Sequence, residues 1–311
     1  MADKTSVFIA GHTGLVGGAV RRLLERDPAF RLVLRTHAEL DLRDQAAVQA
    51  FFEAERPDMV VLAAATVGGI WANDHYPADF IYDNLAISTN VIHAAYLSGT
   101  SRFLNLGSSC TYPRLAEQPI REEALLTGPL EPTNQWYAVA KLAAVKMIEA
   151  YRRQYGFNGL TLMPTNVYGP GDNFDPEASH VIPALLRRFH EAKLTGLESV
   201  VLWGTGSPLR EFMHVDDLAS ACAYFLGLDT DETLLNVGVG SDLSIADLAR
   251  MVADVVGYNG RLEFDTTKPD GMPRKLLSSD RAYALGWRPA IPLRQGLEST
   301  YAWFCEHKAA K

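Results

Sequence analysis

The chain runs Val7-Phe-Ile-Ala-Gly11-His-Thr-Gly14-Leu-Val-Gly17 almost at its start, an apolar run followed by three evenly spaced glycines. The apolar run predicts a buried strand, and the glycines predict a tight turn into a helix over residues 15–26. Glycines in such a turn let the backbone approach a diphosphate, and the helix N-terminus supplies N–H groups and positive potential. A plain βα turn would also satisfy the Gly-x-x-Gly-x-x-Gly spacing, but the strand–turn–helix context favours dinucleotide binding. The cofactor-binding candidates here are Gly11, His12, Thr13, Gly14, Leu15, Val16 and Gly17.

Apolar runs alternate with helical stretches through the rest of the first half. We expect strands at residues 32–34, 59–64, 103–106 and 160–163, and helices over 46–55, 84–97 and 137–155. Strands that alternate with helices indicate βαβ units, so the predicted fold is α/β, a Rossmann-like doubly wound parallel sheet. Such sheets bind ligands at the carboxyl ends of their strands.

The second half of the chain is less regular. We expect loops over 164–176 and 268–275, helices over 183–193 and from Ser244, and a strand at 200–203. These patterns predict a cofactor-binding Rossmann domain over residues 1–166, to which residues 212–239 return. A smaller, mixed α/β substrate domain is expected over residues 167–311.

The composition excludes several classes of function. Among 311 residues there are 37 acidic and 29 basic side chains, a net charge of −8 that does not suggest a nucleic-acid surface. The three cysteines are widely spaced and form no CxxC pair, so we expect neither a disulfide framework nor a metal site. No apolar run approaches the ~18 residues of a membrane span, and no signal segment is visible. We therefore expect a cytoplasmic protein.

The strongest chemical signal is the pair Tyr137 and Lys141, which lie one turn apart on one face of the expected helix. A lysine ammonium beside a phenol lowers the tyrosine pKa, so the phenol can exchange a proton with a carbonyl or alcohol oxygen. Ser108 and Cys110 follow the strand expected at 103–106, at the edge of the sheet where ligands bind. An exposed helix pair and a small buried cysteine are the alternatives that these residues alone leave open.

The end of the second strand distinguishes the two nicotinamide cofactors. An acidic side chain there would hold the free ribose hydroxyl of NAD, and a basic one accommodates the phosphate of NADP. The strand ends in Arg35, and no acidic residue follows before Glu39, which favours NADP. Asp41 and Leu42 could contact the adenine, and a solvated surface arginine is the alternative for Arg35.

Together these motifs resemble the extended short-chain dehydrogenases/reductases and, within them, the GDP-L-fucose synthases. The resemblance runs nearly end to end, and its most specific segments are residues 67–73, 107–113, 131–134, 163–169, 179–190, 210–217 and 268–275. It implies NADPH-dependent epimerisation at C3 and C5 and reduction at C4 of GDP-4-keto-6-deoxy-D-mannose to give GDP-L-fucose. It also implies a homodimer formed by the helices near 84–97 and 137–155.

The resemblance implies a role for each catalytic residue. Ser108 would hydrogen-bond the C4 oxygen, Tyr137 would protonate it, and Lys141 would bind the nicotinamide ribose. Cys110 would be the base of the epimerisation and His180 the acid, and both side chains can titrate near neutral pH. Further NADP(H) contacts are expected from Leu106, Gly107, Ser109, Lys141, Pro164, Thr165, Asn166, Val167 and His180. The expected substrate-binding residues are Arg188, Trp203, Arg210, Asp270 and Lys275.

The chain departs from the family pattern at three positions. Thr13 and His37 stand where bacterial relatives often carry arginine, which leaves Arg35 as the main basic candidate for the NADP phosphate. Trp136 stands directly before Tyr137, where proline or a small residue is expected, so the sugar is less certain than the chemistry. The alternatives are a C4 reductase of another GDP-4-keto sugar, such as a 6-deoxy-heptose or colitose precursor, and a non-enzymatic NADP-sensing protein.

Overall fold

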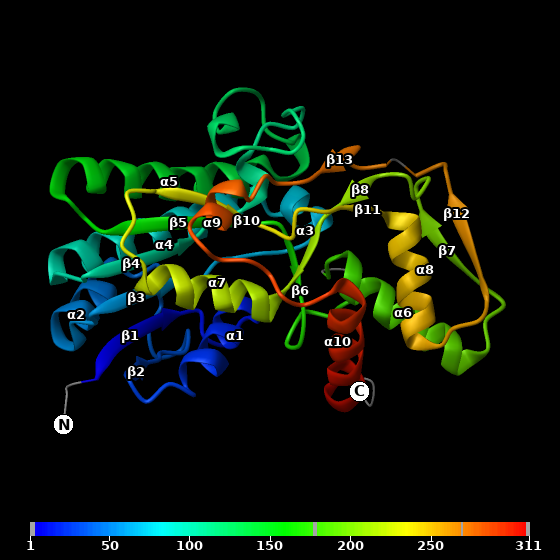
Figure 1. The fold of residues 1–311 in the computed structure, drawn as a ribbon, viewed down its shortest axis with the longest axis horizontal. Helices are drawn as coiled ribbons and strands as arrows, with labels where there is room; N and C mark the ends of the chain where they lie inside the picture. The colour runs from blue at the N-terminus through cyan, green and yellow to red at the C-terminus, as the bar shows by residue number, and fades with distance from the viewer. Residues whose placement is uncertain (1–3, 177–178, 269, 309–311) are drawn as a thin grey trace.

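The computed structural model describes residues 4–176, 179–268 and 270–308 (Figure 1). Its main sheet has six parallel strands in the order β2-β1-β3-β4-β5-β10. The strands are β1 (Thr5–Ala10), β2 (Phe30–Val33), β3 (Met59–Leu62), β4 (Arg102–Leu106), β5 (Gly159–Pro164) and β10 (Leu234–Val237). The chain order reverses between β1 and β3, which is where a doubly wound sheet forms its ligand crevice. The predicted fold class is confirmed.

Helices cover both faces of this sheet. One hydrophobic core lies under α2 (Gln45–Glu55), α4 (Pro77–Ser98) and α5 (Gln135–Tyr155). A second core lies under α1 (Leu15–Leu24) and α7 (Val215–Gly227) on the other face. Burial of the sheet on both faces explains why most residues of its strands are apolar, with a few buried polar side chains such as Asn105, Thr161 and Asn236 among them.

A third hydrophobic core is built entirely from side chains between residues 168 and 304. Its helices are α6 (Val181–Thr195), α8 (Ile245–Val256) and α10 (Leu293–His307). The short strands in this part of the chain are β6 (Asn166–Tyr168), β7 (Ser199–Trp203), β8 (Leu209–Arg210), β9 (Phe212–His214), β11 (Leu243–Ser244), β12 (Arg261–Asp265) and β13 (Arg274–Lys275). Figure 1 shows α6, α8, α10, β7 and β12 together on the right of the molecule, beside the main sheet.

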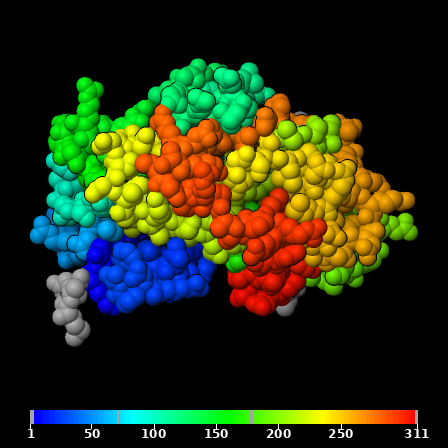
Figure 2. Space-filling model, in the orientation of Figure 1, coloured from blue at the N-terminus to red at the C-terminus, as the bar shows by residue number. Residues whose placement is uncertain are grey.

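The chain returns to the main sheet after the third core. α9 (Asp280–Ala284) and Trp287 pack on α7, where the Trp287 indole N–H donates to Ser220 Oγ at 3.0 Å. Figure 2 shows this orange segment lying against the yellow surface of the sheet unit. Residues 280–287 therefore pack away from the rest of the predicted 167–311 domain, and the domain division itself stays a prediction.

Several elements differ from the sequence-based expectations. β6 lies inside the predicted loop 164–176 and β13 inside the predicted loop 268–275, because each short strand forms only by pairing with a distant one. Pro269 of the second loop lies outside the described residues. Helix α4 begins seven residues earlier than expected, with Pro77 in its first turn, a position that proline tolerates. The remaining elements are α3 (Ile70–His75), η1 (Ser109–Thr111), η2 (Glu122–Ala124) and η3 (Pro132–Asn134).

Two of the three glycines between β1 and α1 are required by the backbone itself. Gly11 has a φ of +87°, and a Cβ there would lie 2.7 Å from the backbone N of Ala64. A Cβ at Gly17 would lie 2.2 Å from the carbonyl oxygen of Gly11. At Gly14 a Cβ would meet only that same oxygen, at 3.5 Å, so Gly14 keeps open the space in front of the helix.

We predict that Gly17→Ala and Gly14→Ala separate folding from cofactor binding. Gly17→Ala forces a backbone shift and should lower the free energy of unfolding by about 2–3 kcal/mol, as overpacking does. Gly14→Ala should lower it by less than about 1 kcal/mol, the cost of a poorer N-cap. Both should weaken NADPH binding. Urea denaturation of the cofactor-free proteins checks this, and equal stability of the two variants would contradict it.

Candidate active site

The turn between β1 and α1 fits the diphosphate of a dinucleotide. Gly14 is the N-cap of α1 and offers no side chain to the first-turn N–H groups, which are therefore open to an anion. Thr13 and Gly14 are exposed beside it. His12 is buried, and its Nδ1 has no hydrogen-bond partner among the described residues. An orphaned buried nitrogen and an open helix N-terminus are features that a bound dinucleotide would satisfy.

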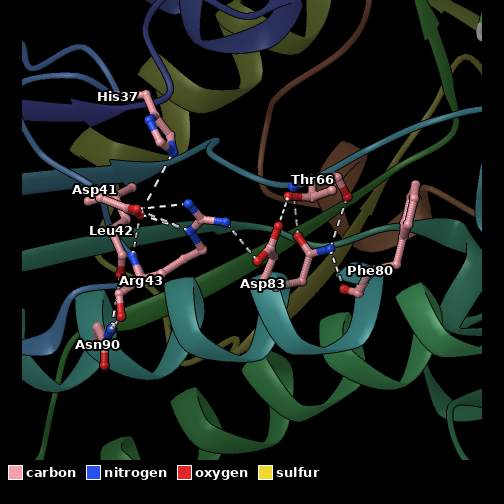
Figure 3. Close-up of polar contacts among 9 residues, drawn as sticks. His37, Asp41, Leu42, Arg43, Thr66, Phe80, Asp83 and Asn90 are labelled. Atoms are coloured by element: carbon pink, nitrogen blue, oxygen red, sulfur yellow. Dashed lines mark hydrogen bonds and ion pairs between the residues drawn. The ribbon is translucent and has the colours of Figure 1, made fainter. Parts of the chain in front are cut away.

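Figure 3 shows the polar contacts that hold the segment after β2 against α4. Arg43 donates to Asp41 at 2.8 Å and to Asp83 on α4 at 3.1 Å. Thr66 Oγ1 in turn donates to Asp83 at 3.0 Å. Hydrogen bonds from Arg43 lower the pKa of Asp41 to about 2. Asp41 is thus a fixed carboxylate beside the buried Leu42, and their contacts with adenine stay a prediction.

The Arg35 side chain, which the sequence predicts at the NADP phosphate, contacts helix α2 in this structure. Its guanidinium forms an ion pair with Glu55 of α2 at 2.5 Å and lies 5.4 Å from the centre of the Phe51 ring. It also donates to the carbonyl of Leu34 at 2.8 Å. A position at the end of β2 does not fix the direction of the side chain, and Glu55 already neutralises the charge. The role of Arg35 at the NADP phosphate stays a prediction with less support.

The segment after β4 places Ser108 and Cys110 at the carboxyl edge of the sheet. Ser108 caps η1, and its Oγ accepts the backbone N–H of Cys110 at 3.2 Å. β4 passes tightly against β5 at this point, since a Cβ on Gly107 would lie 2.3 Å from Met163 Sδ. Leu106 and Ser109 on either side are buried. The two reactive side chains are thus held on a fixed turn.

Lys141 and Tyr137 reach the same edge from α5. The buried Lys141 ammonium donates to the Leu106 carbonyl at 2.9 Å and lies 5.9 Å from the centre of the Tyr137 ring. Burial lowers the pKa of Lys141 to about 8. Burial raises the pKa of Tyr137, the negative charge of Cys110 raises it further, and hydrogen bonding to Ser108 opposes both.

The expectation that Lys141 lowers the pKa of Tyr137 is therefore wrong for this structure. The ammonium is bound to a backbone carbonyl, and burial of the phenol raises the Tyr137 pKa above its ordinary value. A raised pKa keeps the Tyr137 phenol protonated at neutral pH. A protonated phenol is the form that can donate to a carbonyl oxygen as the oxygen becomes negative.

Lys275 contacts Cys110 directly. Its Nζ donates to Cys110 Sγ at 3.6 Å. Burial alone would raise the pKa of the thiol, but the Lys275 charge, with hydrogen bonds to Ser108, Lys275 and Asn134, lowers it below the ordinary value. The Lys275 ammonium therefore lies against the thiol, and its expected contact with the substrate stays a prediction.

His180 stands at the start of α6, of which it is the N-cap. Its imidazole is solvent-accessible and has no hydrogen-bond partner within residues 4–176, 179–268 and 270–308. The protein around it still desolvates the ring and lowers its pKa. A neutral, unengaged imidazole at this point is available to a bound molecule.

Three of the expected substrate-binding side chains are free of acidic partners. Trp203 is 72% exposed, which excludes core packing, and Lys268 Nζ lies 5.5 Å from the centre of its ring. Arg210 is half-buried, and burial lowers its pKa. No carboxylate pairs with Arg210 or Arg188 among the described residues. The fourth, Asp270, is engaged, since it accepts from the Thr205 backbone N–H at 2.9 Å and its hydroxyl at 2.7 Å.

Glu211 ties the segments around this edge together. Its buried carboxylate accepts the N–H groups of Val239 and Gly240 at 2.7 and 2.8 Å and that of Leu277 at 3.1 Å. Its carbonyl accepts from Thr165 Oγ1 at 3.2 Å and from Asn166 Nδ2 at 2.8 Å. These bonds fix Pro164, Thr165, Asn166 and Val167, the residues expected at the nicotinamide.

Two further residues near the site are not among the functional residues that the sequence predicts. Asn134 hydrogen-bonds to Cys110, while its buried Oδ1 has no partner among the described residues. Its position just before the helix of Tyr137 was a usable signal. Arg43 follows the expected adenine contacts Asp41 and Leu42, but its link to Asp83 depends on the fold.

Neither a membrane-spanning helix nor a cluster of metal ligands is present among the described residues. None of their helices is both long and apolar enough to cross a membrane. Nor do three or more of their histidine, cysteine or acidic side chains come together as metal ligands would.

Comparisons with known proteins agree with this geometry. GDP-L-fucose synthase 1 of Arabidopsis thaliana is 57% identical over 99% of this chain and 95% of its own. A GDP-6-OMe-4-keto-L-xylo-heptose reductase from C. jejuni has a similar structure, with a TM-score of 0.92, 37% identity and 99% of both chains covered. A GDP-L-fucose synthetase from Naegleria fowleri bound to NADP has a TM-score of 0.90 at 29% identity, covering 100% of this chain and 98% of its own.

A family model gives the most general result. It is described as the NAD dependent epimerase/dehydratase family and matches residues 7–238, which span the glycine turn, Ser108, Tyr137 and Lys141. Both the family match and the high identity to full-length relatives extend over the main sheet and the site at its carboxyl edge. The chain therefore belongs to the NAD dependent epimerase/dehydratase family.

Proposed function

We propose that this protein converts GDP-4-keto-6-deoxy-D-mannose to GDP-L-fucose by epimerisation at C3 and C5 and NADPH-dependent reduction at C4. The observation that carries the proposal is the meeting of Ser108, Cys110 and Tyr137 at one edge of the sheet, with Lys275 on the thiol. A generic reductase needs only the phenol and lysine, whereas a thiol beside them supplies acid–base chemistry at carbon. The name of the Arabidopsis relative supports the same reaction.

NADP(H) is the proposed cofactor. The open N-terminus of α1 would hold its diphosphate, and Asp41 and Leu42 would lie at its adenine. Lys141, Asn166 and their neighbours would lie at the nicotinamide end. When bound, NADPH supplies the hydride for C4. The Naegleria structure, which contains NADP, supports this choice.

Epimerisation would begin at Cys110. A ketone at C4 makes the hydrogens on C3 and C5 acidic, because the electron pair left behind is delocalised onto the ketone oxygen. The Cys110 thiolate takes the proton and becomes a thiol, while Ser108 and Tyr137 hydrogen-bond the enolate oxygen. His180, once solvent has protonated it to the imidazolium, returns a proton to the opposite face of the ring, and Cys110 releases its proton to solvent before the next step. The imidazole has no hydrogen-bond partner among the described residues that would hold it away from the ring.

Reduction would follow at the same oxygen. Tyr137 is protonated at neutral pH, as an ordinary tyrosine is, and burial and the nearby thiolate raise its pKa further. The phenol therefore donates its proton as the C4 oxygen becomes an alkoxide. Ser108 holds that oxygen in place. Lys141 would position the nicotinamide ribose while its ammonium remains anchored on the Leu106 carbonyl.

The nucleotide end of the substrate would lie along β7 and β8. The half-buried Arg210 and the exposed Arg188 have no acidic partner in the described chain and can pair with diphosphate oxygens. The exposed Trp203 ring can stack on guanine. Asp270 holds Thr205 beside this strand and would shape the pocket from the side.

Another GDP-4-keto sugar is the second candidate substrate. Trp136 is 43% exposed in the first turn of α5, directly before Tyr137, where a bulky side chain can alter which sugar fits. The name of the C. jejuni relative shows that such substrates occur among similar proteins. A non-enzymatic NADP-sensing protein is disfavoured, because such a protein would need neither Cys110 nor the phenol.

We also propose a cytoplasmic homodimer. α4 and α5 pack against each other and carry exposed apolar side chains at Leu97, Val139 and Tyr155. A second copy would cover them. Light scattering at micromolar concentration should give twice the chain mass of 34.2 kDa, and the monomer mass would contradict the proposal.

Two variants should separate the half-reactions. Cys110→Ser should slow wash-in of solvent deuterium at C3 and C5 by at least about 100-fold, because an alcohol is a far weaker acid than a thiol. Tyr137→Phe should impair reduction by a similar factor and leave the exchange measurable. Proton NMR of the keto sugar in deuterated buffer measures both. Normal exchange in the cysteine variant would remove Cys110 from the role of base.

The cofactor assignment predicts that NADPH binds at least about tenfold more tightly than NADH, as a phosphate–arginine contact of ~1.4 kcal/mol would give. Arg35→Met should reduce the difference between the NADPH and NADH dissociation constants if the Arg35 guanidinium breaks its ion pair with Glu55 and binds the NADP phosphate. Arg31→Met is the matched control, since Arg31 also approaches Glu55, at 3.9 Å. Fluorescence titration of the unmodified protein and both variants with each cofactor measures the six dissociation constants. Tighter binding of NADH to the unmodified protein would overturn the assignment.

A further inference from the structure

We propose that Lys275 is the positioning residue of Cys110, whose thiolate form its ammonium stabilises, so that the base of the epimerisation is ready at neutral pH. The role of the thiolate as a base rests on the proposed function, whereas its stabilisation by Lys275 does not. Lys275 would act through Cys110 and need not touch the reacting carbon. This role differs from the direct contact with substrate that the sequence predicts for Lys275.

The geometry places the ammonium firmly. β13 pairs with β8 so that Lys275 lies opposite Arg210. The next residues are then held against the 118–120 segment: Leu276 N–H donates to Gln118 Oε1 at 2.8 Å, and Ile120 N–H donates to the Leu276 carbonyl at 2.8 Å. One residue further, the Leu277 N–H is bound by Glu211. Lys275 is thus on a strand fixed at both ends, with its Nζ 3.6 Å from Cys110 Sγ.

The charges around the thiol favour the same conclusion. Arg274 is neutralised by Asp242 at 2.5 Å, but no acidic side chain within the described residues pairs with Lys275. The positive charge of Lys275 therefore interacts with the Cys110 sulfur and is not neutralised by a carboxylate of the described residues. By contrast, a lysine held for structural reasons would be expected to meet a carboxylate.

The other titratable groups around Cys110 come from α5 and β8. The Tyr137 phenol is neutral at pH 7, and its pKa is raised further by burial and by the charge of Cys110. Lys141, one turn further, donates to the Leu106 carbonyl and not to the sulfur. Asn134, before the helix, contributes a neutral hydrogen bond. Arg210 lies across from Lys275 and donates to Leu209. Lys275 is the cation in direct contact with the thiol among the described residues.

The chemistry explains why such a contact is needed. A free cysteine has a pKa near 8.5, so only a few per cent is thiolate at pH 7, and burial would reduce that fraction. Only the thiolate can take the proton from C3 or C5. Burial raises the pKa of Tyr137, and the same negative charge raises it further, so the thiolate does not promote ionisation of the neighbouring phenol.

The test is the pH dependence of Cys110 alkylation by iodoacetamide, measured without any nucleotide sugar. A Cys305→Ser background removes the other accessible thiol, since Cys222 is fully buried. Lys275→Met should raise the alkylation midpoint by at least about one pH unit and slow alkylation at pH 7 about tenfold. Lys275→Arg should restore most of the midpoint. Arg274→Met, the adjacent cation already paired with Asp242, should leave it unchanged.

An unshifted midpoint in Lys275→Met, with only a higher KM for the nucleotide sugar, would overturn the proposal and favour the diphosphate role. A Lys275→Gln variant, similar in size and polar, provides the same test if the methionine variant fails to fold. Deuterium exchange at C3 and C5 should show the same pH shift as alkylation. Because alkylation needs no substrate, a protein that failed to make GDP-L-fucose would leave this result interpretable.

Discussion

The buried carboxylate of Glu211 is the interaction on which the site depends most. No cation among the described residues forms an ion pair with it, and it is held by backbone N–H groups from two separate segments, after β10 and after β13. Its own carbonyl binds the residues that follow β5. A buried charge is stable only when such bonds replace water. Glu211 therefore joins the end of the main sheet to the strand that carries Lys275, and sets the distance between the two halves of the site.

Inside the site, burial has a larger effect on most side-chain pKa values than ion pairing has. Burial lowers the pKa of Lys141 and raises that of Tyr137, and it would also raise that of Cys110. Only at Cys110 does a nearby cation outweigh burial, because Lys275 is in contact with the sulfur. The result is a neutral phenol beside a thiol of lowered pKa. Those are the protonation states that proton removal at carbon followed by protonation at oxygen requires.

Local sequence patterns were sufficient for the sheet, the glycine turn and the pair Tyr137 and Lys141, since each depends on residues close together in the chain. They failed where partners are distant. β6, β8 and β13 have two or three residues each and exist only through pairing across the chain. Arg35 could not be assigned to Glu55, nor Lys275 to Cys110, because side-chain direction depends on how the units pack. Only the structure excludes core packing for Trp203, because it shows that the side chain is exposed.

The central claim is that one site performs proton transfer at carbon and hydride transfer to C4. The most direct measurement is NMR of the product formed from GDP-4-keto-6-deoxy-D-mannose and unlabelled NADPH in deuterated water. The account predicts GDP-L-fucose with deuterium at C3 and C5 and protium at C4. A product reduced at C4 that keeps the manno configuration and protium at C3 and C5 would contradict it.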